Sequence, residues 1–143
     1  MPMTAASGVA VAVTFVWCGM VLAISFIETP LKFRAPEVTV RIGLGIGRLV
    51  FRALNTAEIV LALALLGAAL IEHPPRDIGI TGAVAVIALI VQVAVVRPRL
   101  TRRSDLVLAG AEVPRSHAHY VYVGLELVKL SALLATGTLL ISQ

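Results

Sequence analysis

The sequence predicts an all-α protein, a bundle of four transmembrane helices, and two observations carry that prediction. Hydrophobic residues make up 59% of the 143 residues and charged residues only 14%, whereas about 25% of a soluble domain is charged. The apolar residues also gather in four stretches of about 20 residues, the length that a helix needs to cross a bilayer. We therefore expect one integral membrane domain, residues 1–143, with no room for a second domain.

Four apolar spans, separated by prolines, define the expected helices. They cover residues 6–27, 54–71, 78–96 and 118–141. In lipid, an open chain of this length can satisfy its backbone hydrogen bonds only as helices. The prolines fall between the spans and are expected to end the helices. They are Pro30, Pro36, Pro74, Pro75, Pro98 and Pro114.

The charges between the spans predict the orientation in the membrane. Five basic residues lie between the first and second spans and five between the third and fourth, whereas the second connection has only Arg76, beside Glu72 and Asp77. The positive-inside rule therefore places the two basic connections in the cytoplasm and both termini outside. We expect a multi-pass protein of the cell (inner) membrane.

The isoelectric point near 10 does not indicate a nucleic-acid partner. The basic residues stand beside hydrophobic spans, which is typical of topology control and of attraction to anionic lipids. The bilayer is therefore the expected partner, and no nucleic acid is expected.

Residues 38–54, before the second span, mix basic and apolar side chains. Polar residues recur on one helical face at spacings of seven, four and three: Arg41, Arg48, Arg52 and Asn55. We expect an amphipathic cytoplasmic extension of the second helix, half-buried at the interface. Three glycines interrupt it: Gly43, Gly45 and Gly47. They indicate a bend, or a place where another helix approaches closely.

The fourth span carries polar residues along one face. His119, Tyr122, Glu126 and Lys129 follow one another at intervals of three, four and three, so all four project from the same side of a helix. Ionisable groups at membrane depth cost roughly 3 kcal/mol each, so they usually face a partner or a cavity. Two interpretations stay open: a self-neutralising Glu126–Lys129 pair that holds the helix in the bundle, or a titratable carboxylate with a functional role.

Polar residues in the other spans could complete a site with this stripe. Asn55 and Glu58 share a face of the second helix, and Gln92 could supply a hydrogen bond from the third. Trp17, near the middle of the first span, needs a partner for its indole N–H or a ligand to stack on. We expect the polar stripes to enclose a cavity open toward the cytoplasm, with two arginines at its entrance. The predicted ligand-binding residues are Trp17, Arg48, Arg52, Asn55, Glu58, Gln92, His119, Tyr122, Glu126 and Lys129.

No metal or cofactor is expected. His117 and His119 are two residues apart, so they project from different faces of a helix and cannot bind one ion together. The single cysteine, Cys18, excludes an internal disulfide and a cysteine-based metal cluster.

Several short motifs are shared with a known family: Trp17-x-Gly19, Pro30-x-x-Phe33, Phe51 and the histidine that opens the fourth span. In these the chain resembles the uncharacterised small four-helix integral membrane proteins that include a human transmembrane protein associated with platinum-drug resistance. The resemblance covers most of the chain and implies the four-helix fold. The Glu126-x-x-Lys129 motif and the triple-glycine segment lie outside the pattern. That family has no settled activity, so no functional residue is carried over.

These observations favour a membrane protein that binds or transports a small amphipathic or ionic solute through a polar intramembrane cavity. Glu126 and Glu58 would be its titratable groups, and a homodimer is expected because four helices rarely enclose a pathway alone. One alternative is a membrane-embedded enzyme, an acid/base isomerase or cyclase acting on a lipid-soluble substrate, with Glu126 as general acid and His119 or Glu58 as base. The other is a structural subunit of a membrane complex, in which the polar residues join helices.

Overall fold

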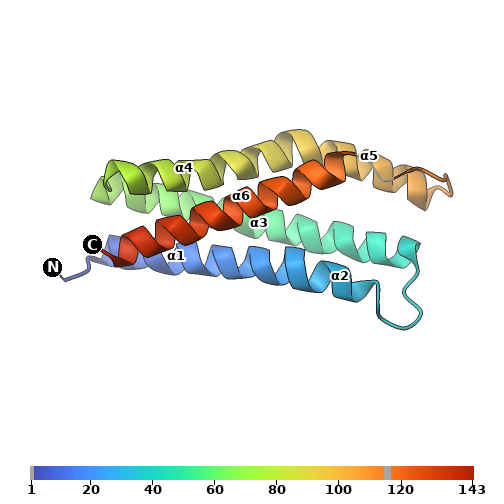
Figure 1. Cartoon of the computed structure of the whole chain (residues 1–143), viewed down its shortest axis with the longest axis horizontal. Coiled ribbons are helices and arrows are strands. Elements are labelled where there is room, and N and C mark those ends of the chain that lie inside the picture. The colour runs from blue at the N-terminus through green and yellow to red at the C-terminus, as the bar shows by residue number, and fades with distance from the viewer. Residues whose placement is uncertain (1, 115–116) are drawn as a thin grey trace.

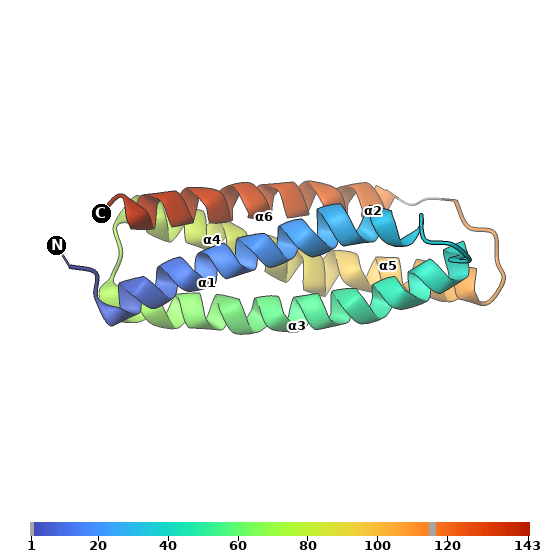
Figure 2. The same cartoon turned by 90° about the horizontal axis from the view of Figure 1, so that it is seen from below.

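Four long helices run side by side in this computed structural model, which describes residues 2–114 and 117–143 (Figures 1 and 2). Within those residues, four helices are long and apolar enough to cross a membrane: Ala5–Lys32, Val40–Glu72, Arg76–Leu108 and His117–Ile141. This all-helical architecture was predicted from the composition. It suggests a multi-pass membrane protein.

Two of the four helices contain a π-helical segment in which the turns are wider than in an α-helix. The helical segments, in chain order, are α1 (Ala5–Val21), η1 (Leu22–Glu28), α2 (Thr29–Lys32), α3 (Val40–Glu72), α4 (Arg76–Val91), η2 (Gln92–Val96), α5 (Arg97–Leu108) and α6 (His117–Ile141). The segments α1, η1 and α2 form the first long helix, and α4, η2 and α5 form the third.

The bundle has two chemically different ends. Both termini and the turn at residues 73–75 lie at one end, which we call the terminal end, and the connections at 33–39 and 109–114 lie at the other (Figures 1 and 2). We call the second the basic end, because the arginine-rich parts of the chain meet there. Helix α1 packs against α3 and α6, and α6 packs against α4, whereas α3 and α4 contact each other little.

Pro30 and Pro98 do not end their helices, contrary to expectation. A proline cannot donate a hydrogen bond to the carbonyl four residues earlier, and its ring clashes with that carbonyl. Here each proline follows a π-helical segment by two residues, since η1 ends at Glu28 and η2 at Val96. The wider turn relieves the clash. The helices therefore continue beyond the prolines, and the expected spans 6–27 and 78–96 are parts of longer helices.

Helix α3 includes the amphipathic region before the second span, without interruption. The Thr39 hydroxyl caps its first turn by accepting a hydrogen bond from the Ile42 N–H (3.2 Å). A Cβ atom at Gly43 would collide with the ring of Phe33. Gly43 is thus a point of close approach by Phe33, the residue that follows α2, rather than by another helix.

Candidate functional site

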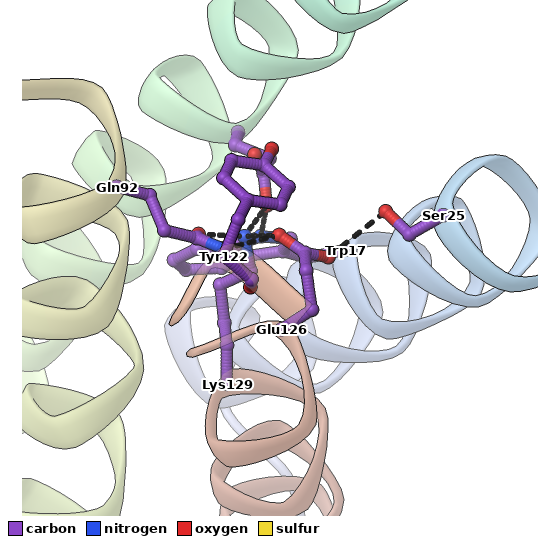
Figure 3. A network of polar contacts seen from close by, with 7 residues as sticks. Trp17, Ser25, Gln92, Tyr122, Glu126 and Lys129 are labelled. Carbon is purple, nitrogen blue, oxygen red and sulfur yellow. Dashed lines mark hydrogen bonds and ion pairs between the residues drawn. The ribbon is translucent and has the colours of Figure 1, made fainter. Parts of the chain in front are cut away.

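Two carboxylates and one ammonium group are buried together inside the bundle (Figure 3). Glu58 lies on α3, and Glu126 and Lys129 lie on α6; their exposed fractions are 0%, 1% and 0%. The Lys129 ammonium forms ion pairs with both carboxylates and lies 2.8 Å from Glu126 Oε1. Breaking such a buried pair from one side is costly, because the remaining charge has no water to stabilise it. We call Glu58, Glu126 and Lys129 the charged cluster.

Gln92, the first residue of η2, completes the bonding of the Lys129 ammonium. Its side-chain oxygen accepts a hydrogen bond from Lys129 Nζ (2.7 Å), and its nitrogen donates to Glu126 Oε1 (2.6 Å). The same nitrogen is 3.3 Å from the Tyr122 carbonyl oxygen. The ammonium thus has three partners, one for each of its protons. Its bonding capacity is saturated without water.

The first helix supplies one donor to each carboxylate. The indole N–H of Trp17 donates to Glu58 Oε1 (3.0 Å), and the Ser25 hydroxyl donates to Glu126 Oε2 (2.9 Å) (Figure 3). The need of a buried indole for a partner is therefore met by a carboxylate. We call the charged cluster, Gln92, Trp17, Ser25 and the groups bonded to them the polar network. It joins all four long helices.

A chain of polar contacts connects the charged cluster to the surface at the basic end. The Asn55 amide, turned so that its nitrogen faces Glu58 and its oxygen faces Arg97, donates to Glu58 Oε2 (3.2 Å) and accepts from Arg97 Nη1 (2.8 Å). Arg97 also donates to the carbonyl oxygen of Arg48 (3.3 Å), and Arg48 forms a surface ion pair with Asp105 (2.6 Å). Side-chain and backbone polar groups therefore lead without a break from the surface to Glu58.

Aromatic rings pack beside this chain of contacts. The rings of Phe51 and Tyr122 meet edge to face, with centroids 5.7 Å apart. Lys32 Nζ and Arg97 Cζ lie 5.7 and 5.8 Å from the centroid of the Phe51 ring, within the range of cation–π attraction. The Tyr122 hydroxyl is buried near the Arg97 guanidinium but makes no hydrogen bond of good geometry within the described residues. Two cations and two rings thus cover the cluster on its basic side.

The opposite side of the cluster is apolar. Buried core residues there come from all four helices and include Ala10, Leu65, Ala85 and Leu133. The charged cluster lies near the middle of the bundle. Glu58, Gln92 and Glu126 are 14 to 16 residues, or about 22 Å, from the terminal ends of their helices, and Glu58 and Gln92 are 18 and 16 residues from the basic ends of theirs. A hydrocarbon core is about 30 Å thick. The charged cluster therefore lies deep within a layer of that thickness, and the packing on its terminal side is mostly apolar.

Seven of the ten predicted ligand-binding residues take part in the network or pack directly beside it. They are Trp17, Asn55, Glu58, Gln92, Tyr122, Glu126 and Lys129. Arg48 forms the surface ion pair, and Arg52 is exposed. His119 is also exposed, two turns before Glu126, and its ring lies 6.0 Å from that of Tyr120. These three residues lie toward the basic end of the bundle rather than at the cluster.

No open cavity borders the three charged side chains in this arrangement of the described residues. Their exposed fractions are close to zero, and residues of the network are absent from the lining of two hollows elsewhere in the described part of the chain. The reason is geometric: side chains from neighbouring helices bond to the charged groups and occupy the space around them. A lipid-soluble substrate would need room beside Glu126, so the closed site offers no support to the enzyme interpretation.

Ser25 and Arg97 were missed in the sequence, and the π-helical segments explain why. Arg97 follows Gln92 by five residues, and residues five apart lie on different sides of an α-helix. The wide turns of η2 bring both side chains to the same network. Ser25 lies within η1. A proline inside an otherwise continuous helix was the available signal for such a segment.

Comparison of the chain with protein-family models, with curated protein sequences and with solved structures finds no match.

Proposed function

We propose that this protein is an integral membrane carrier for a small ionic solute, and that the charged cluster is the site at which a proton or a small monovalent cation is exchanged. The observation that carries the proposal is the surplus of one acidic group: Glu58 and Glu126 share the single ammonium of Lys129 in a buried site. Fully ionised, the cluster holds one net negative charge. A charge at membrane depth costs several kcal/mol, roughly 3 on insertion scales.

One bound proton or one small cation would remove that cost. The nearest other positive group is Arg97, which the Asn55 amide separates from Glu58 and which is only half-buried. The remaining ionisable neighbour, Tyr122, contributes no positive charge. Charge balance therefore favours occupancy of the cluster by a cation.

The two sides of the cluster suggest how access could alternate. The chain of polar contacts offers a way in from the basic end, while apolar packing closes the terminal side. The π-helical segments η1 and η2 supply Ser25 and Gln92 to the network. π segments are frequent at functional sites, and a return of either segment to α-helical geometry would withdraw its side chain from Glu126.

The orientation and assembly are parts of the same proposal. The positive-inside rule places the basic end in the cytoplasm and both termini outside the inner membrane. We infer a homodimer, because the closed bundle of four helices holds no continuous polar path from end to end within the described residues.

The proposal is tested in proteoliposomes that contain a trapped pH-sensitive dye. Gradients of sodium, potassium and methylammonium ions are imposed in turn, and proton movement is recorded. In the wild type, at least one gradient drives proton movement above that of empty liposomes. Glu126→Gln and Glu58→Gln reduce it at least about tenfold, whereas Glu112→Gln, an exposed acid outside the polar chain, leaves it unchanged. Proton movement equal to that of empty liposomes under every gradient would contradict the proposal.

A structural role is the second candidate, and one observation favours it. Lys129 has three partners, and the network ties together all four helices, as expected of polar groups that hold a membrane bundle in register. A purely structural cluster predicts that Glu126→Gln changes stability and leaves every ion flux at the level of the wild type. The same liposome measurement therefore separates the two candidates.

A further inference from the structure

The terminal end of the bundle contains a hollow of about 300 Å³ that is separate from the charged cluster. Residues of all four helices line it, and none of them belongs to the polar network. It lies where α3 and α4 contact each other little, below the turn at residues 73–75.

Small side chains keep this space empty. Ala68 and Ala69 line it from α3, and Gly79 and Gly82 line it from α4. A Cβ atom added at Gly79 would meet nothing within 4 Å, and one at Gly82 would meet only the Thr136 methyl group, at 4.0 Å. A small side chain at either glycine would therefore enter open space without a close contact. A volume of this size lies at the low end of small-molecule pockets and accommodates roughly ten groups the size of a water molecule.

The hollow reaches from the outer surface of the bundle to its core. Leu66 on α3 and Ile87 on α4 line it and are 53% and 58% exposed, whereas Ala10 and Ile78 line it and are buried. In a bundle that spans a bilayer, the exposed apolar side chains face lipid. A ligand could therefore enter sideways from the membrane, between α3 and α4.

One carboxylate marks the outer end of the hollow. Glu72 is the one ionisable side chain among the described lining residues. It accepts a hydrogen bond from the Thr4 hydroxyl, a neutral group, and the ion pairs within the described residues do not include it. Arg76 lies nearby in the sequence but does not line the hollow. Among the described residues, the charge of Glu72 is thus left without a cationic partner beside an apolar space.

We propose that this hollow binds a small amphipathic cation, an alkyl or aryl ammonium compound whose apolar part fills the space and whose charge pairs with Glu72. The charge complementarity selects a cation over an anion or a neutral lipid chain, and the volume limits its size. The site does not depend on the carrier function proposed for the charged cluster.

The test uses hexyltrimethylammonium, which has ten non-hydrogen atoms, about the number that the volume accommodates. Binding of the radiolabelled compound to the protein in nanodiscs is measured by equilibrium dialysis, and binding to empty nanodiscs is subtracted. We expect saturable binding that unlabelled hexyltrimethylammonium displaces at least about tenfold more effectively than hexanol or hexanoate. Glu72→Gln weakens the binding about tenfold, since it removes the charge and keeps the shape.

Matched variants separate the site from general effects on the bundle. Asp77→Asn removes another exposed acid at the same end that does not line the hollow, and it leaves binding unchanged. Gly82→Leu and Gly79→Leu fill the space and abolish binding, whereas Gly67→Leu, which adds a side chain to α3 outside the hollow, preserves it. Absence of saturable binding overturns the proposal. Equal binding of hexanol, or binding insensitive to Glu72→Gln, also overturns it, because the hollow would then be a site for a neutral chain.

Discussion

The two halves of the bundle bury different kinds of side chain, although the same four helices form both. Toward the basic end, the interior holds charges, and the buried polar groups are bonded with almost no exception among the described residues. Toward the terminal end, the interior is mostly apolar, and a hollow of about 300 Å³ remains unfilled. The difference shows that burying a charge demands complete pairing, whereas burying methyl groups tolerates missing contacts at a moderate cost.

Packing also differs between helix pairs within the terminal half. Helices α1 and α6 approach so closely that a Cβ atom at Gly137 would lie 2.7 Å from the Phe15 ring. Helices α3 and α4 leave open space beside Gly79 and Gly82. Gly137 therefore permits close contact between α1 and α6, whereas Gly79 and Gly82 line an open space beside α3.

The largest expected effect is at Lys129, which would break the pairing in the charged half. Lys129→Met leaves Glu58 and Glu126 buried without their shared cation, so we expect a loss of about 3–5 kcal/mol in the free energy of unfolding. The measurement is reversible unfolding in mixed detergent micelles. The triple variant Glu58→Gln, Glu126→Gln, Lys129→Met removes all three charges and should recover most of that loss. A single variant as stable as the wild type would show that the charges are not buried.

A pair of glycine variants compares the tight and the open parts of the apolar half. Gly137→Ala places its methyl group against the Phe15 ring and should destabilise the protein by about 1–3 kcal/mol. Gly82→Ala enters open space and should be neutral or stabilising by up to about 1 kcal/mol, because alanine restricts the unfolded chain. The same unfolding measurement checks both. Equal destabilisation by the two variants would mean that the hollow closes in the membrane.

Removing one hydrogen bond from the polar network tests how much a single bond to a buried carboxylate contributes to stability. Ser25→Ala removes the donor to Glu126 Oε2 and should cost about 1 kcal/mol in the free energy of unfolding. Ser131→Ala, at an exposed position of α6, is the matched control and should change stability by less than about 0.5 kcal/mol. Identical values for the two serines would place Ser25 outside the network.

The architecture could be predicted from the sequence because it depends on composition and length, which are properties of whole segments. The facing of Glu58 and Glu126 followed from polar residues at helical spacing on two spans. The closed state of the site could not be predicted in the same way. It depends on whether Gln92, Trp17 and Ser25 reach the charges, and this is set by the relative rotation of helices that are far apart in the chain.

The prolines explain the remaining errors. Pro30 and Pro98 were expected to end helices, because a regular α-helix cannot contain a proline without loss of a hydrogen bond. Each π-helical segment absorbs that defect and changes the face on which the following residues lie. Arg97 thereby reaches Asn55, although it lies five residues after Gln92 and would lie on another side of a regular α-helix.

The smallest expected effect concerns the one ion pair of the polar chain that water reaches. Arg48 and Asp105 are 2.6 Å apart, yet their side chains are 36% and 57% exposed. Water already stabilises both charges when they are separated, so Asp105→Asn should lower the free energy of unfolding by less than about 0.5 kcal/mol. The effect should decrease further in high salt, unlike that of Lys129→Met, because screening acts on exposed charges and reaches buried ones poorly. A loss of stability as large as that of Lys129→Met, and independent of salt, would contradict this prediction. It would show that the Arg48–Asp105 pair is shielded from water like the charged cluster.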